Sequence, residues 1–327
     1  MKYKDYYLEN TLYSMFKGED YDYDTIEKGE IFLSFPKKFN DPFDCAILID
    51  KLSFERAFIK RELGEDFVNN SPFEDVFRAI SFYNNCKAFV PKKVLERDFS
   101  SFEGVQTDGL KEKCDNLYNE YSKALDDIKN EYGVACFTTN LPQKNMVMWA
   151  HYANNYKGFC CQFELDFYDI DTDCDKKGTY RFAQHFRAVE YADSFVSNFV
   201  DVDRLLECNP EELKNSPYIR NFIEESFYKK YTQWSYENEH RLVINKNDTA
   251  FEKTIMTDAG FRIKFPYLFK LFINPDRTRD TEKIKSICIK RNILSVCLKP
   301  SQDGIILLED KDSSLDINLD VRISQFQ

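Results

Sequence analysis

Hydrophobic positions along the chain group into short runs that predict β-strands, separated by longer stretches of helical pattern. Glu30–Phe35 predicts a strand that ends at Pro36, because proline cannot continue a ladder of hydrogen bonds. Further apolar or alternating runs predict strands at residues 133–138, 157–164, 187–191, 253–256, 261–265, 293–298 and 304–308. Strands are therefore expected before and after a long middle segment that lacks this strand pattern.

That middle segment, residues 53–131, has a helical and charge-rich pattern with breaks at Pro72 and Pro91. A second helical stretch runs from about 194 to 231, and a shorter helix is predicted near 281–291. Long helical segments between strands that need not be sequential neighbours favour an α+β fold over a doubly wound one.

We therefore expect mixed, largely antiparallel sheets that form a central cleft. No linker or internal repeat divides the sequence, which favours a single domain of residues 1–327 with residues 53–131 as a helical insertion.

The run Trp234–Arg241 concentrates polar chemistry directly before the apolar residues Leu242-Val243-Ile244. If the run is a strand throughout, alternation puts Glu237, Glu239 and Arg241 on one face. Such a polar group is expected at the entrance of the strand, where a cleft can receive it. The two glutamates are candidate catalytic residues. The alternative is an ion-pair ladder in which Arg241 is the cation between two carboxylates.

A second cluster, Met148–Ala153, is the candidate for the opposite wall of that cleft. Projected as a helix over residues 144–153, it has an apolar stripe that includes Trp149, with His151 nearly opposite and Tyr152 to the side. His151 is a candidate catalytic residue. The alternative is a histidine that bonds a backbone carbonyl on a neighbouring loop.

The turn Phe39–Asp44 contains two aromatic residues, Phe39 and Phe43, on either side of Asn40-Asp41-Pro42. We expect Asn40 and Asp41 to join His151 and Glu239 in one cleft and to contact a ligand. The alternative is that both side chains bond only to their own backbone.

Composition narrows the classes of function. A formal net charge of -11 disfavours a broad nucleic-acid footprint, which needs clustered cations. The apolar runs are shorter than a transmembrane helix and the first residues are too polar for a signal peptide, so we expect a cytoplasmic protein without membrane contact. The ten cysteines are scattered and are expected to be free thiols.

Several kinds of site are not predicted. The three histidines, at positions 151, 185 and 240, have no paired ligand spacing, so no metal is expected. Cys160-Cys161 fits strand core better than a nucleophile. A Rossmann loop, a Walker loop and the GxSxG and HExxH motifs do not occur in the sequence.

The motifs together resemble a widespread bacterial family of unknown function. Its pattern includes a turn like Phe39–Asp44, a short strand like Ala135–Phe137, a helix like Trp149–Ala153, a strand like Lys157–Cys160 and a late element like Trp234–Arg241. The resemblance spans about residues 10 to 300. It brings no established activity with it.

A further resemblance is to ADP-ribosyltransferases, which bind NAD in a cleft between two small sheets. An early His or Arg, a middle Ser or Tyr and a late Glu hold the nicotinamide ribose in that superfamily. The resemblance implies Ser34 as the middle residue and Glu239 as the late one, with Glu237 its partner. Near Tyr13, at the early strand, there is neither His nor Arg, and His151 is the candidate to supply the donor.

This resemblance implies an enzyme that cleaves NAD, its substrate, at the nicotinamide–ribose bond, as a toxin or defence effector with an unknown macromolecular acceptor. Glu239 would stabilise the oxocarbenium character of the ribose. Arg241 or Lys157 would meet the pyrophosphate, and Trp149, Tyr152 or Phe43 would stack on a ring. One alternative is a module that senses a nucleotide or peptide without turnover. Another is a metal-dependent hydrolase of nucleotides or nucleic acid that uses Asp41, Glu237 and Glu239.

Overall fold

The protein is described by a computed structural model in which residues 11–69, 71, 74–86, 88–102, 109–165, 182, 185–301 and 304–309 are placed. The chain divides into two compact units. Unit 1 comprises Met1–Asn40, Tyr132–Tyr191 and Thr232–Gln327, and unit 2 comprises Asp41–Glu131 and Ala192–Tyr231. The segment predicted as a helical insertion therefore groups with the second helical stretch in unit 2. Whether the units form a single domain stays a prediction.

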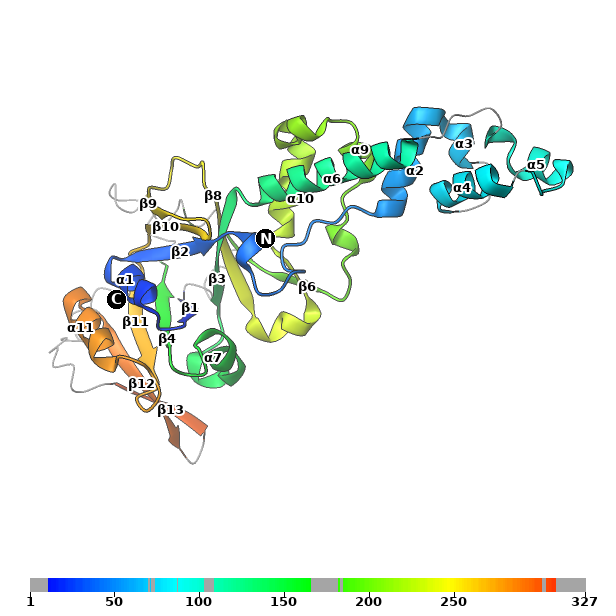
Figure 1. Ribbon diagram of the computed structural model, residues 1–327. Helices are drawn as coiled ribbons and strands as arrows, with labels where there is room; N and C mark the ends of the chain where they lie inside the picture. Colours follow the sequence, from blue (N-terminus) through cyan, green and yellow to red (C-terminus); the bar gives the residue numbers. More distant parts are fainter. Residues whose placement is uncertain are drawn as a thin grey trace, which may run out of the picture. The chain divides into compact units, whose positions relative to one another are not determined.

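Unit 1 is built on a mixed sheet that has eleven strands within the described residues (Figure 1). Nine strands follow in the order β13-β12-β11-β4-β1-β3-β2-β10-β9, while β8 pairs with β3 and β5. Among the described strands of this sheet, β11 and β12 alone pair in parallel, so the predicted α+β class with a mixed, largely antiparallel sheet is confirmed. The strands are β1 (Thr11–Phe16), β2 (Glu30–Ser34), β3 (Tyr132–Thr138), β4 (Phe159–Glu164), β5 (Phe186–Ala188), β8 (Glu239–Asn245), β9 (Lys253–Met256), β10 (Gly260–Lys264), β11 (Leu268–Ile273), β12 (Leu294–Ser301) and β13 (Gly304–Glu309).

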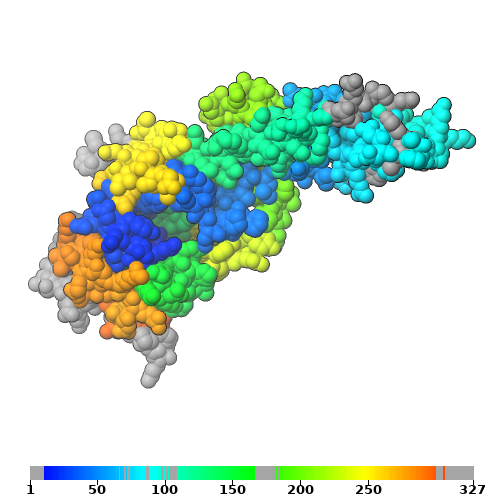
Figure 2. Space-filling model, in the orientation of Figure 1, coloured from blue at the N-terminus to red at the C-terminus, as the bar shows by residue number. Residues whose placement is uncertain are grey.

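Three α-helices within the described residues accompany this sheet: α1 (Asp20–Glu27), α7 (Met146–Tyr152) and α11 (Thr281–Arg291). Figures 1 and 2 show α1 and α11 side by side, and the ion pairs Lys283–Asp20 and Lys290–Glu27 join them. Short 3-10 helices cover Pro36–Lys38 (η2), Pro142–Lys144 (η4) and Thr232–Glu237 (η7). The predicted helix at 281–291 is therefore present with the same bounds.

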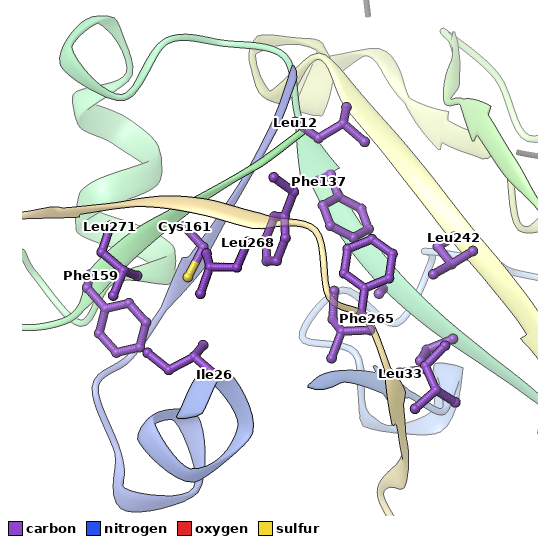
Figure 3. Close-up of a cluster of buried hydrophobic side chains, with 14 of the residues drawn as sticks. Leu12, Ile26, Leu33, Phe137, Phe159, Cys161, Leu242, Phe265, Leu268 and Leu271 are labelled. Carbon is purple, nitrogen blue, oxygen red and sulfur yellow. The ribbon is translucent and has the colours of Figure 1, made fainter. Parts of the chain in front are cut away.

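The two faces of the sheet differ in chemistry. One face, here called the apolar face, carries the main hydrophobic core, with Leu12, Phe137 and Leu242 from three different strands (Figure 3). Because side chains alternate along a strand, the neighbours of these residues point the other way. That opposite face is packed by α7 through the fully buried Trp149 and Ala153, and it is here called the α7 face.

Unit 2 is mainly helical, as the pattern of residues 53–131 and 194–231 predicts. Phe54 packs its ring against Tyr118 and Tyr121 at the centre of this unit. A buried ion pair joins Lys230 to Asp44 at 3.5 Å. The elements are α2 (Lys51–Leu63), α3 (Glu65–Asn69), α4 (Val76–Cys86), α5 (Lys92–Asp98), η3 (Ser100–Phe102), α6 (Leu110–Lys129), η5 (Val196–Asn198), α9 (Val202–Leu205), η6 (Pro210–Asn215), α10 (Pro217–Ser226) and β7 (Lys229–Tyr231), and β6 (Glu190–Ala192) lies where the chain enters the unit.

Among the helices that the structure describes, none combines the length and apolar character that a membrane crossing requires.

Candidate functional site

The polar run before β8 is a turn followed by a strand. η7 ends at Glu237, Asn238 has a left-handed backbone with φ of 44°, and β8 begins at Glu239. Asparagine tolerates this conformation better than most residues. The prediction of one continuous strand was therefore wrong at Glu237 and Asn238, because the left-handed residue turns the chain there. Glu239 and Arg241 do alternate along β8 as predicted.

Glu239 and Arg241 form a two-point ion pair. The Nε of Arg241 donates to Oε1 of Glu239 at 2.7 Å, and Nη2 donates to Oε2 at 3.1 Å. Arg241 is 0% exposed and Glu239 is 4% exposed. The guanidinium also lies 5.8 Å from the ring centre of Phe39. Both charges are thus out of water, and their geometry is the fork that matches a guanidinium to a carboxylate.

Glu237 contacts two neighbouring elements, α7 and β3. Its carboxylate accepts a short hydrogen bond from the hydroxyl of Tyr152, the last residue of α7. Its backbone carbonyl accepts a hydrogen bond from the hydroxyl of Thr138 at 2.5 Å. Glu237 is 2% exposed. The two motifs therefore do meet, and Tyr152 is the residue that joins them. We call Glu237, Glu239, Arg241 and Tyr152 the acidic network.

The other predicted residues of the α7 region have different surroundings. His151 is exposed, with its ring 6.2 Å from that of Tyr152, and Lys157 is exposed as well. Trp149 is fully buried, stacks on Tyr156 and donates from its indole to the carbonyl of Pro142 at 2.9 Å. A ligand ring could stack on Trp149 only by displacing these contacts.

The turn at Asn40 and Asp41 crosses the boundary between the units. The carboxylate of Asp41 accepts a hydrogen bond from the backbone N–H of Phe43 at 2.9 Å, which is the local bond considered as the alternative. Asn40 is exposed and ends a segment of unit 1. A shared cleft of this turn with His151 and Glu239 stays a prediction.

The strand register places three distant positions on one face of the sheet. Tyr13 on β1 pairs with Thr138 on β3, which pairs with Glu239 on β8. Ser34 on β2 pairs with Val134, two pleats from Thr138 along β3. Directly paired residues point to the same side, so Tyr13, Ser34 and Glu239 all belong to the α7 face. Sequence patterns alone did not reveal this register.

Burial controls the titration of the groups on and near this face. It raises the pKa of Tyr13, and electrostatic interactions with Cys160 and with the carboxylate of Glu164 act in the same direction. Burial also raises the pKa of the Cys160 and Cys161 thiols. These cysteines are core residues rather than nucleophiles, as the sequence indicated. In the part of the chain that is described, no three His, Cys, Asp or Glu side chains gather as a metal site would require.

Residues 148–242 match a family described as "Protein of unknown function (DUF2971)". The matched segment includes the part of α7 from residue 148 on, β4 and the acidic network, but not the turn at Asn40 or strand β3. Comparisons with curated proteins and with solved structures give no match.

Proposed function

We propose that the α7 face of unit 1 binds NAD and cleaves its nicotinamide–ribose bond, as an ADP-ribosyltransferase-like enzyme does. The observation that supports this is the shared face of Tyr13, Ser34 and Glu239. In this proposal the three residues take the roles of the early, middle and late strand positions at which the superfamily holds the nicotinamide ribose, with Tyr13 in place of the superfamily's His or Arg.

The chemistry assigns different tasks to the residues. Glu239 supplies the negative charge that stabilises the oxocarbenium character of the ribose in the transition state. Its two oxygens bond Arg241, so a ribose hydroxyl has to replace or share one of those bonds. Tyr13 takes the early position, and burial keeps its phenol protonated as a donor. Glu237, held by Tyr152, is the partner carboxylate.

The buried ion pair favours a second candidate, a module that binds a nucleotide without turnover. A carboxylate that already has two charge-assisted bonds and 4% exposure is well placed to hold a structure and poorly placed to meet a reacting ribose. In this case Glu239 would position the site and the bound nucleotide would remain intact.

One experiment separates the two candidates. The full chain is incubated with NAD, with and without cell lysate, and nicotinamide release and label transfer to macromolecules are measured. The matched variants are Glu239→Gln and Glu252→Gln, the second being an exposed carboxylate on another part of unit 1. Turnover by the wild type that falls roughly 100-fold in Glu239→Gln and not in Glu252→Gln supports the enzyme.

Binding of NAD without release would support the sensing module instead. No binding of NAD by calorimetry at millimolar concentration would contradict the NAD proposal. Thermal unfolding of both variants has to be measured in parallel, since a loss of folding in Glu239→Gln would assign that residue to the ion-pair ladder.

A further inference from the structure

A pocket of about 350 Å³ opens on the α7 face, on the other side of Tyr13 from the acidic network. Its floor is the sheet, and the loop around η4 forms one wall. Strands β1, β4 and β11 bring Tyr13, Gln162 and Lys270 into direct register, one residue on each neighbouring strand. The size falls within the range of pockets that bind small molecules.

The apolar part of this pocket includes Leu141, which is 40% exposed, and the buried residues Phe272 and Pro142. Phe272 lies on β11, with its ring centre 6.0 Å from that of Tyr13, and Pro142 faces the pocket from η4. The carbonyl of Pro142 is held by the indole of Trp149, so this wall is fixed from behind. Leu141 is therefore the side chain of this apolar wall that a ligand can reach.

The lining contains two polar groups, the ammonium group of Lys270 and the side-chain oxygen of Gln143, that a ligand could bond. Lys270 is half-buried, and among the described residues its ammonium group faces no carboxylate; its closest recorded contact is the ring of the adjacent Phe269 at 5.0 Å. The Oε1 atom of Gln143 is buried and accepts no hydrogen bond from any described residue. A buried acceptor without a donor is costly. The described residues therefore supply no donor to this Gln143 oxygen, and a carboxylate near the pocket, Glu164, is bonded by Gln162 rather than by Lys270 (Nε2 to Oε1, 3.0 Å).

We propose that this pocket is a binding site for a nucleoside monophosphate. The phosphate pairs with Lys270, the base lies against the exposed side chain of Leu141, and an N–H group of the base donates to Gln143. A compact ammonium is a suitable partner for phosphate. Gln162 and the phenol of Tyr13 add a polar edge between these two ends. The proposal does not depend on NAD cleavage, because Lys270 and Gln143 have no role in the NAD site; Tyr13 is the residue that the two sites share.

Calorimetry with AMP and GMP tests the site on the full chain. Lys270→Met should weaken binding roughly ten- to hundredfold, since it removes one charge-assisted contact. The matched control is Lys299→Met, an exposed lysine on the adjacent strand β12 whose side chain lies on the other face. Gln143→Met should weaken binding of the mononucleotide and leave binding of inorganic phosphate unchanged.

Binding that is lost in Lys270→Met and kept in Lys299→Met and Glu239→Gln supports the site, and the last variant separates it from the NAD proposal. Equal loss in the two lysine variants would overturn it. So would equal affinity for AMP and inorganic phosphate, which would show that the base is not recognised, or a wild type that binds neither mononucleotide at millimolar concentration. Unfolding midpoints of all variants confirm that each is folded.

Discussion

The two faces of the sheet in unit 1 use the same strands for different purposes. On β3, Phe137 points into the apolar face, while its neighbour Thr138 points to the α7 face and bonds Glu237. On β8, Leu242 joins the core, while Arg241 is equally buried and carries a charge. Apolar burial is favourable in itself, whereas a buried charge needs its partner to avoid a penalty.

This difference indicates what each face contributes. A buried ion pair adds little net stability compared with apolar residues of similar size, and breaking it is expensive. The apolar face therefore accounts for the fold. Net stability does not explain why Glu239 and Arg241 are buried on the α7 face. A role in the proposed site would explain it.

The largest expected effect is on the apolar face. Phe137 is 2% exposed and its ring contacts those of Phe163, Phe186 and Phe265. Phe137→Ala should lower the free energy of unfolding by roughly 4 kcal/mol or more through lost burial and the cavity left behind. Chemical denaturation measures this. Phe137→Leu is the control and should cost clearly less; equal costs would mean that ring packing does not determine stability here.

A smaller and conditional effect is expected at the ion pair. Arg241→Met leaves the Glu239 carboxylate buried without its cation and should cost roughly 3 kcal/mol. The double variant Glu239→Leu with Arg241→Met removes both charges and should recover most of this loss. Denaturation of the two variants side by side provides the measurement. A double variant as unstable as the single one would contradict the view that this pair contributes little to net stability.

The same contrast explains how far the sequence could be interpreted. Alternation and apolar runs located β2, β3 and β4 and the buried stripe of α7, because burial leaves a periodic trace. Strand β11 was not predicted, although it supplies Lys270 and Phe272 to the pocket. The bond between Tyr152 and Glu237 joins residues far apart in sequence, and such pairing depends on register, which periodicity does not specify.

The unusual composition of Trp234–Arg241 marked it as a candidate site, but the sequence did not predict the geometry of this run. The left-handed backbone at Asn238 separates Glu237 from the strand, so Glu237 meets Tyr152 of α7 while Glu239 meets Arg241 within β8. A single asparagine gives only a weak signal for such a turn. The sequence thus indicated which residues are candidates for the site, and the fold determines which partners they bond.

The smallest effect at neutral pH is expected at Tyr23, a polar exception on the apolar face. Its ring lies 5.4 Å from that of Phe159, and its buried hydroxyl has no hydrogen-bond partner among the described residues. Burial raises the pKa of Tyr23 from 10.0 to about 12, and the charges of Asp280 and Asp22 add to the shift. Tyr23→Phe removes a hydroxyl without a partner, so at neutral pH it should change stability by less than about 1 kcal/mol.

Alkaline pH should separate the two proteins. The unfolded chain loses the Tyr23 proton near pH 10 and the folded chain near pH 12, so the stability linked to this group is fully present below pH 10 and is lost as the pH rises through 12. Phenylalanine has no proton to lose in this range, so the stability of Tyr23→Phe does not change with pH through this group. Urea unfolding of both proteins at several pH values between 8 and 11 should show a steeper decline for the wild type. If the free energy of unfolding falls with pH equally in both proteins, the hydroxyl ionises equally easily in the folded and unfolded chains. Water would then reach the Tyr23 hydroxyl more easily than its burial indicates.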